Sequence, residues 1–344
     1  MDCACPLCES RRHVWLKEIQ ASDLIEKYRR FFQIDVKHYF PEPSVALVQC
    51  ADCRLKYFHP RSEGKSDLYE QLERFEWYYQ DEKPEFEYAL EKLMEKKPSS
   101  VLEIGCGDGR FLKKICRLFP VRAREYNEKA LKKLAQMGIP LDEEGMKYDF
   151  VMAFQVLEHV EDVKGFLDLC VEKLNDGGYL LITVPNNDSK YINEVDVILD
   201  HPPHHATQWP KAALYEVARI YSLDVEEYYV DPLRFEHYRA IIDSRRRTLP
   251  LGDLFEQSGG VFRHLVSAID RVLAPFFTTS YPIPDTRMDA CIKKAEGEQS
   301  HIDASDENAQ CGLRQRVSSG LGQCGFDAGR SGRHAPGRDG TVAF

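Results

Sequence analysis

The sequence has no long uninterrupted apolar run. Its longest apolar stretch, 261–277, is interrupted by Arg263, His264, Asp270 and Arg271, and its apolar residues recur at helical spacing. This pattern predicts an amphipathic helix rather than a membrane span. The N-terminus also lacks the basic segment followed by an apolar core that is typical of a secretory signal. The sequence therefore predicts a cytoplasmic location.

An excess of positive charge is also absent. The 344 residues include 46 lysines and arginines against 56 aspartates and glutamates, which gives a formal net charge of −10. A general nucleic-acid binder needs a basic face for its phosphate contacts, so this charge argues against that class. The short basic run at 245–247 is interpreted as a solvated helix face. The expected partner is a small-molecule substrate.

Changes in composition divide the chain, which is long enough for two domains. Residues 1–60 contain paired cysteines and are predicted to form a zinc-binding module. Residues 61–97 are rich in aromatic and charged side chains and are predicted to form a helical connector. Residues 98–296 are predicted to form the main domain, with lid or substrate elements at 187–285. From 297 to 344 the apolar periodicity ends, which predicts a disordered tail.

Short apolar runs alternate with amphipathic segments from 99 to 186. This alternation is typical of a parallel sheet covered by helices, so the predicted fold is α/β, with a doubly wound, Rossmann-like sheet. The predicted strands are 101–104, 121–125, 150–154, 179–184 and 225–230, and the alternation of Met288, Ala290 and Ile292 predicts a last strand that closes the sheet. The predicted helices are 111–118, 128–136, 163–174 and 211–220.

The first predicted strand leads into a glycine-rich turn, VLEIGCGDG at 101–109. Glycines permit positive φ there and let a ligand approach the backbone, and the helix that follows offers unpaired N–H groups. Dinucleotide-binding folds favour GxGxxG, but Arg110 stands where the third glycine would be. Glu103 would repel a pyrophosphate and can hold an ammonium group. The turn therefore favours S-adenosylmethionine over a dinucleotide, with an ordinary strand–helix turn as the alternative.

A second acid, Glu125, follows the next predicted strand, about twenty residues after the glycine turn. An acid at this spacing can accept hydrogen bonds from both hydroxyls of a ribose. Taken alone, Glu125 is more often an acid that precedes a helix. Its spacing from Gly105 makes nucleoside binding the preferred interpretation.

From 101 to 186 the chain resembles a class I methyltransferase domain of the ubiquinone-methyltransferase-like group. Three blocks carry the resemblance: VLEIGCGDGRFL, REYNEKAL and YDFVMAFQVLEHVEDVKGFLDLCVEKLNDGGYLLITVPN. The resemblance implies S-adenosylmethionine as the methyl donor. The candidate cofactor-binding residues are Glu103, Gly105, Cys106, Gly107, Asp108, Gly109, Glu125, Tyr126, Gln155 and Leu157.

The same resemblance implies a role for each part of the site. The glycine turn borders the methionine end of the cofactor, Glu125 binds the ribose and Tyr126 lies beside the adenine. The residues along the floor of the site are Gln155, Leu157, Glu158 and His159. The connector 141–148 is shorter than is usual in the family, and Asp142 is the candidate for binding the adenine amino group. For His159, capping of a helix start is an equal alternative.

Two CxxC pairs, Cys5 with Cys8 and Cys50 with Cys53, can present four thiolates to a zinc ion. A closed four-thiolate site is structural, because it has no open position for water. The long gap between the pairs predicts a helical insertion at 21–32. The alternatives are a redox pair or buried free cysteines, but two matched pairs in a reducing compartment favour zinc.

The segment CADCRLKYFHP at 50–60 carries a second resemblance. It resembles the zinc module that precedes the methyltransferase domain in sugar C-methyltransferases and their relatives, where the module forms part of the substrate cleft. The resemblance implies a small polar acceptor, such as a nucleotide sugar or a cell-envelope glycan precursor.

A histidine-rich loop, DHPPHHATQW at 200–209, follows the last parallel strand. Open α/β folds place their chemistry in such loops, and the prolines stiffen this one. Methyl transfer to a hydroxyl or an acidic carbon requires removal of a proton, which suits an imidazole. His205 is the preferred catalytic base, with His204 and His159 as further candidates. A structural loop and a second metal site are the alternatives.

Sugar C-methyltransferases have a His-Glu-His element where this loop has two adjacent histidines. The missing acid leaves both O- and C-methyl transfer open. The favoured hypothesis is a zinc-containing S-adenosylmethionine-dependent methyltransferase that acts on a small polar acceptor, with a loop histidine as general base. A nicotinamide-dependent oxidoreductase is disfavoured by Arg110. A non-catalytic zinc-ribbon interaction protein on a methyltransferase scaffold is disfavoured by the intact glycine turn. A protein or tRNA methyltransferase is disfavoured by the acidic charge, which argues against RNA, and by the lack of an Asn-Pro-Pro-Tyr-like element after Phe154.

Overall fold

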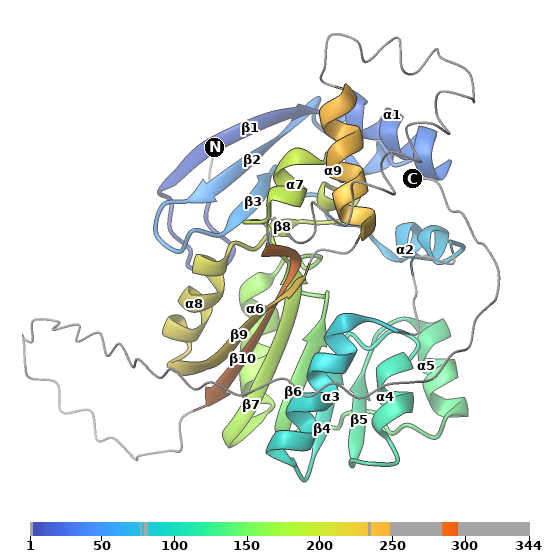
Figure 1. The fold of residues 1–344 in the computed structure, drawn as a ribbon, viewed down its shortest axis with the longest axis vertical. Helices are drawn as coiled ribbons and strands as arrows, with labels where there is room; N and C mark the ends of the chain where they lie inside the picture. Colours follow the sequence, from blue (N-terminus) through green and yellow to red (C-terminus); the bar gives the residue numbers. More distant parts are fainter. Residues whose placement is uncertain (1–2, 76–77, 79–81, 233–234, 248–283, 295–344) are drawn as a thin grey trace, which may run out of the picture. The chain divides into compact units, whose positions relative to one another are not determined.

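The fold is described from a computed structural model of the chain (Figure 1). The residues that the structure describes are 3–75, 78, 82–232, 235–247 and 284–294. They all belong to one compact unit, Met1–Glu298. Among them, no helix has the length and apolar character needed to cross a membrane. The helix predicted at 261–277 and the tail predicted at 297–344 lie outside the described residues.

The first of two sheets has four antiparallel strands in the order β1-β2-β3-β8. The strands are β1 (His13–Gln20), β2 (Ser44–Cys50), β3 (Lys56–His59) and β8 (Thr207–Gln208). The predicted helical insertion is confirmed as α1 (Ala21–Phe32), which follows β1. Leu24, Tyr28 and Phe32 recur every four residues on its buried face. The N-terminal sheet thus takes its last strand from the histidine-rich loop, far outside the predicted 1–60 segment.

The second sheet has six strands in the order β5-β4-β6-β7-β10-β9. Four of them are parallel: β4 (Val101–Ile104), β5 (Val121–Arg124), β6 (Tyr148–Phe154) and β7 (Leu174–Pro185). β10 (Pro284–Lys294) is antiparallel to both its neighbours, β7 and β9 (Leu223–Pro232). The predicted α/β fold and the predicted closing strand are confirmed.

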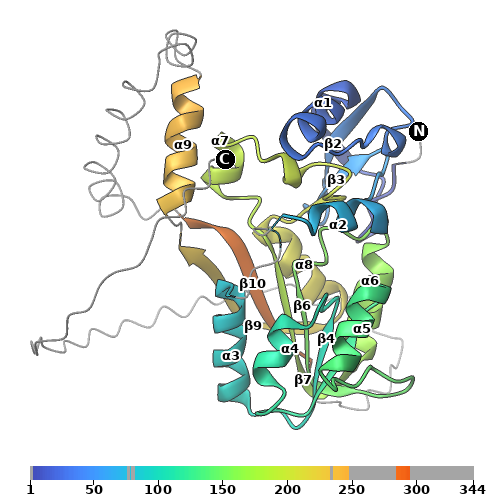
Figure 2. The same ribbon diagram turned by 90° about the vertical axis from the view of Figure 1, so that its right-hand side faces the viewer.

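Helices cover both faces of this sheet, as expected for a doubly wound fold (Figures 1 and 2). One face packs against α3 (Pro84–Lys96), α4 (Arg110–Ile115) and α5 (Glu128–Gln136). The other packs against α6 (Val163–Glu172) and α8 (Lys211–Ile220). The remaining elements are α2 (Ser66–Leu72), α7 (Lys190–Glu194), α9 (Phe235–Arg247), and the short 3₁₀ helices η1 (Lys37–Tyr39) and η2 (Ile198–Asp200).

The N-terminal module and the α/β sheet share one hydrophobic core. The buried residues Leu7, Cys53 and Leu55 of the module belong to the same cluster as Leu102 of β4 and Trp209, which follows β8. Trp209 is fully buried, and its indole Nε1 donates a hydrogen bond to Thr207 Oγ1 at 2.9 Å. The module is therefore packed as part of the main body.

Backbone hydrogen bonds link this module to the loop that follows β6. Phe58 N, in β3, donates to Ala206 O at 3.2 Å. In turn, Ala206 N and Thr207 N both donate to Glu158 O, at 2.8 and 3.1 Å. His204 and His205 directly precede Ala206, so these bonds fix the end of the histidine-rich loop beside the loop after β6.

Candidate active site

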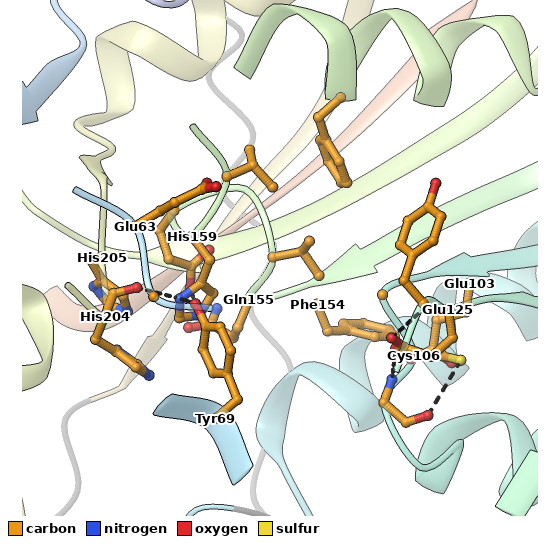
Figure 3. A pocket seen from close by; sticks show the side chains of 18 of the residues that line it. Glu63, Tyr69, Glu103, Cys106, Glu125, Phe154, Gln155, His159, His204 and His205 are labelled. Carbon is orange, nitrogen blue, oxygen red and sulfur yellow. Dashed lines mark hydrogen bonds and ion pairs between the residues drawn. The ribbon is translucent and has the colours of Figure 1, made fainter. Parts of the chain in front are cut away.

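A cleft of about 1150 Å³ lies across the ends of the parallel strands. The segments that line it include the glycine turn after β4, the turn after β5, the loop after β6 with the start of α6, the histidine-rich loop and the connector before α3. Figure 3 shows Glu103, Cys106 and Glu125 at one end of the cleft and the histidines at the other, with Phe154 and Gln155 between them. Open α/β sheets bind ligands in such a crevice.

The glycine turn has the left-handed backbone that its sequence predicts. Gly105, Gly107 and Gly109 have φ angles of 71°, 52° and 75°. A Cβ at Gly105 would lie 2.6 Å from Val156 Cγ2, so the turn and the loop after β6 approach closely. Glycine at this position is required by both its φ and its packing.

Glu125 is held in the cleft by backbone donors. Its Oε2 accepts a hydrogen bond from Gly107 N at 2.8 Å, and its Oε1 accepts from Tyr126 N and Asn127 N at 2.7 and 2.9 Å. Oε2 therefore keeps a lone pair for a further donor, such as a ribose hydroxyl. Tyr126 also lines the cleft, with its side chain 75% exposed.

Glu103 lines the same end of the cleft from the middle of β4. It is buried, and its Oε2 has no hydrogen-bond partner among the described residues. Burial raises the pKa of this carboxyl to about 8, and the nearby negative charge of Glu125 adds to the effect. A carboxyl group in this state should ionise when a cation such as an ammonium group binds beside it.

Three of the predicted cofactor-binding residues lie elsewhere. Leu157 does not line the cleft, because its side chain is fully buried in the core beneath the loop. Gly109 does not line it either; a Cβ there would meet Leu134 of α5 at 2.6 Å, so this glycine serves helix packing. Asp142 accepts hydrogen bonds from Tyr148 OH at 2.7 Å and pairs with Lys173 Nζ at 2.7 Å. It is buried in an ion-pair cluster away from the cleft.

The remaining predicted residues of the glycine turn and of the loop after β6 do line the cleft. They are Gly105, Cys106, Gly107, Asp108, Gln155, Glu158 and His159. Arg110 Nε donates to Asp108 Oδ1 at 3.0 Å, so the arginine that replaces the third glycine orients an acid of the turn.

The structure brings His159 together with His204 and His205, which lie 45 and 46 residues further along the chain. The ring centroids lie 4.6 Å apart for His159 and His204, 4.8 Å for His159 and His205, and 4.7 Å for His204 and His205. All three side chains line the cleft. The sequence indicated each histidine as a candidate, but not that they form one cluster.

Each imidazole of this cluster has its Nδ1 next to an oxygen. His159 Nδ1 lies 2.7 Å from His204 O, His204 Nδ1 lies 2.9 Å from Leu199 O, and His205 Nδ1 lies 3.2 Å from Asp200 Oδ1. A carbonyl oxygen only accepts, as does an ionised carboxylate such as Asp200, so Nδ1 carries the proton and Nε2 the lone pair. Burial lowers the pKa of His159 to about 4 and those of His204 and His205 well below 6.5. The three rings are therefore neutral near pH 7.

Asp200 fixes the position of His205. Its carboxylate accepts hydrogen bonds from Asn187 Nδ2 at 3.1 Å and from Gln208 Nε2 at 2.7 Å, and burial raises its pKa to about 7. An imidazole oriented by a buried acid, with its other nitrogen toward a cleft, can take up a proton from a bound molecule.

Two tyrosines of the connector complete the histidine end of the cleft. Tyr69 OH lies 3.3 Å from His159 Nδ1, and Tyr78 OH donates to His204 Nε2 at 3.0 Å. From the sequence, this segment was identified only as rich in aromatic and charged side chains. Its position beside the histidines depends on tertiary packing, which no local pattern reports.

The four cysteines of the two CxxC pairs also come together. Cys5 Sγ lies 3.4 Å from Cys53 Sγ, Cys8 Sγ lies 3.5 Å from Cys50 Sγ, and all four sulfurs fall within 4.8 Å of one another. A tetrahedral zinc with Zn–S bonds of about 2.3 Å places its sulfurs about 3.8 Å apart, so the four thiolates fit this ion. Cys3 is outside the group, and its Sγ lies 3.6 Å from Tyr57 OH.

Comparison with known proteins agrees with this architecture. Residues 76–227, which include the glycine turn, Glu125 and the loop after β6, match a protein-family model described as a methyltransferase domain. This match covers less than half of the chain. The two cysteine pairs, between Cys5 and Cys53, precede the matched segment, whereas the histidine-rich loop lies within it.

The chain also has curated relatives of low identity. It is similar to a ubiquinone biosynthesis O-methyltransferase of Caulobacter vibrioides, 31% identical over 107 residues, and to one of Chelativorans sp., 29% identical over 105 residues. Each match covers 26% of this chain and 42% of the relative, so the chain spans less than half the length of these proteins. A solved structure of a putative sarcosine dimethylglycine methyltransferase from Galdieria sulphuraria is 16% identical, with a TM-score of 0.41, over 61% of this chain and 85% of that one.

The raised pKa of Glu103 leads to a prediction about stability and donor binding. Between pH 4.5 and about 8 the folded protein retains a proton that the unfolded chain releases, so this carboxyl destabilises the fold as the pH rises through that window. We expect Glu103→Gln to raise the melting temperature of the ligand-free protein by a few degrees at pH 8 and hardly at all at pH 5. S-adenosylmethionine affinity should fall at least about tenfold, because the ammonium loses its counter-ion.

Thermal unfolding at several pH values and equilibrium dialysis measure the two effects. A variant that binds the donor as tightly as the wild type would show that Glu103 does not face it. A stability gain that is the same at pH 5 and pH 8 would contradict the raised pKa.

The close approach at Gly105 gives a second prediction, with Gly138→Ala as a matched control. Both glycines have φ near 70°, but a Cβ at Gly138 meets nothing within 4 Å, whereas one at Gly105 meets Val156. Gly138→Ala should cost about 1 kcal/mol of unfolding free energy. Gly105→Ala should cost about 1–3 kcal/mol more and weaken donor binding, because a β-branched neighbour cannot move aside easily. Urea unfolding of the two variants tests this; equal losses would contradict the close approach.

Proposed function

We propose that the protein is an S-adenosylmethionine-dependent methyltransferase that transfers the methyl group to a hydroxyl of a small polar acceptor. The observation that carries the proposal is one cleft with two chemically different ends. One end has the glycine turn and two carboxyl groups that suit a nucleoside with an ammonium group, and the other has neutral imidazoles. The match of residues 76–227 to a methyltransferase domain supports it.

At the donor end, the residues of the chain would hold S-adenosylmethionine, which supplies a methyl group on a sulfonium when bound. Glu103 would bind its ammonium group, and Glu125 the hydroxyls of its ribose. Tyr126 offers an exposed ring beside Glu125, where an adenine can stack. The glycine turn lets the ligand approach the backbone.

At the acceptor end, His205 is the group best placed to remove a proton. Its Nδ1 is bound to Asp200, so its Nε2 lone pair is available. His204 Nε2 already accepts a hydrogen bond from Tyr78, which makes His204 the weaker candidate. In this mechanism the acceptor hydroxyl gives its proton to His205 Nε2, and Asp200 stabilises the resulting imidazolium.

The charges around the histidines indicate the class of acceptor. Glu63, Glu158, Glu161 and Asp162 line this end of the cleft, against Arg61 and Lys83. An excess of carboxylates disfavours a diphosphate in the same space. An uncharged, hydroxyl-rich acceptor, such as a glycan precursor without phosphate, therefore fits better than a nucleotide sugar. The similarity to ubiquinone biosynthesis O-methyltransferases supports a hydroxyl as the acceptor group.

We also propose that Cys5, Cys8, Cys50 and Cys53 hold a structural zinc ion. The second pair directly precedes β3, which pairs with β8 beside the histidines. A metal in this position would stabilise the N-terminal sheet and, through it, the histidine-rich loop. Because four thiolates close the coordination shell, this ion would take no part in methyl transfer.

Labelled donor tests the proposal directly. The protein should bind S-adenosylmethionine and not NAD in equilibrium dialysis, since Glu103 opposes a pyrophosphate. With radiolabelled methyl donor, uncharged oligosaccharides and polyols should become labelled on oxygen, and the corresponding nucleotide diphosphate sugars should not. Binding of NAD alone would contradict the activity, and selective labelling of nucleotide sugars would contradict the acceptor class.

The proposed base has a matched control in the same loop. His205→Ala should lower kcat by about 10²–10⁴-fold without changing donor affinity, because only proton removal is lost. His201→Ala should stay near wild type, since His201 does not line the cleft and its Nδ1 binds Val197 O. Steady-state kinetics with the labelled acceptor and donor dialysis separate the two variants. Equal rates for wild type and His205→Ala would refute the assignment.

A further inference from the structure

We infer that His159, His204 and His205 form a binding site for a divalent transition-metal ion, best suited to zinc, at the acceptor end of the cleft. One ring nitrogen from each histidine lies within 4.8 Å of the others. This cluster is distinct from the four cysteines, with which it shares no residue. Figure 3 shows the three imidazoles gathered at one side of the cleft, opposite Glu103 and Glu125.

The hydrogen bonds of the three imidazole rings are the strongest support for a metal site. Histidines that bind a metal usually donate their other ring N–H to a carbonyl or a carboxylate, which fixes the tautomer and aims the lone pair at the ion. All three histidines have such an anchor, with Nδ1 beside His204 O, Leu199 O and Asp200 Oδ1 respectively. Three separately anchored rings on two loops are more than a single base requires.

The protonation state of the rings is also the one that a metal needs. Neutral imidazoles coordinate, whereas imidazolium groups do not. A cation among three ring nitrogens that lie within 4.8 Å of one another would be stabilised by their lone pairs. Tyr78 OH donates a hydrogen bond to His204 Nε2 and would give up this bond when a metal binds.

The surrounding charges allow a cation at this position. Glu158 Oε1 lies 3.9 Å from His159 Nε2, and its side chain is 1% exposed. When ionised, this carboxylate would oppose the positive charge of Lys83, which also acts on His159. A tetrahedral zinc with Zn–N bonds of about 2.1 Å holds its nitrogens about 3.4 Å apart. The rings would therefore move toward one another by about an ångström, which rotation of their side chains allows.

Three neutral nitrogen ligands leave one position of a tetrahedral ion open toward the cleft. Such sites bind a water or a substrate oxygen in the fourth position, unlike closed four-thiolate sites. Imidazole ligands suit zinc, copper, nickel and iron rather than magnesium or calcium. The metal would use the same lone pair of His205 that the proposed function assigns to proton removal, so metal binding and proton uptake at His205 exclude each other.

Cobalt(II) is the probe for the site, because its absorption spectrum distinguishes sulfur from nitrogen ligands. The full-length protein is treated with a chelator and titrated with cobalt(II), with total metal measured by elemental analysis. We expect two metal ions per chain in the wild type. One should show the near-ultraviolet charge-transfer band of cobalt thiolates, and the other only visible bands without it.

Variants of two histidines on different loops locate the second ion. His159→Ala and His205→Ala should each retain the thiolate-bound ion and bind the other at least about tenfold more weakly. His201→Ala, in the same loop but outside the cluster, should bind both ions. Circular dichroism and S-adenosylmethionine binding by each variant show whether it is folded.

One metal ion per chain in the wild type, or a second ion that persists unchanged in both folded variants, would overturn the inference. Donor binding and methyl transfer are measured on the chelator-treated protein as well. If these persist while the second ion is absent, only the metal site fails. If donor binding is absent while the second ion is found, the proposed function fails and the metal site stands.

Discussion

The site depends on a backbone junction at Glu158 O, where one carbonyl accepts hydrogen bonds from both Ala206 and Thr207. This junction joins the loop after β6 to the histidine-rich loop, and the pairing of β3 with β8 joins both to the N-terminal sheet. His159 lies directly after the acceptor residue, and His205 directly before the two donors. The juxtaposition of their imidazoles is therefore set by main-chain hydrogen bonds, which are less sensitive to side-chain substitution than a packed contact.

Burial has opposite consequences at the two ends of the cleft. At the donor end it disfavours the charge of Glu103, so the free protein holds a neutral carboxyl where a cation is expected to bind. At the other end it disfavours the imidazolium form, so the histidines remain neutral and keep their lone pairs. Burial thus holds Glu103 and the histidines in their neutral forms. While no ligand is bound this costs stability or reactivity, and a bound ligand can change the protonation state.

Patterns that act within one element were predictable from the sequence. The helices Glu128–Gln136 and Lys211–Ile220, the strand Val101–Ile104 and the glycine turn appear where periodicity and turn chemistry predicted them. The four cysteines could be grouped because two CxxC pairs constrain each other. The donor end of the site was thus largely predictable from the sequence, since most of it lies in one strand–turn–helix unit.

What the sequence did not reveal depends on contacts between distant segments. Two residues, Thr207 and Gln208, were not predicted to add a strand to the N-terminal sheet, because so short a strand has no periodicity of its own. Leu157 and Asp142 were assigned to the site by family position, whereas packing and an ion-pair cluster direct their side chains elsewhere. The grouping of three histidines and two tyrosines likewise arises only once the two sheets meet.

The position of β8 far along the sequence from β3 has a consequence for synthesis on the ribosome. The N-terminal sheet can form its first three strands early, yet the outer edge of β3 stays without its partner until Gln208 has emerged, after all four parallel strands of the other sheet. At about 5–20 residues per second this interval is on the order of ten seconds. During it the nascent chain presents an open edge to other strands, so this region is where chaperone protection would matter most.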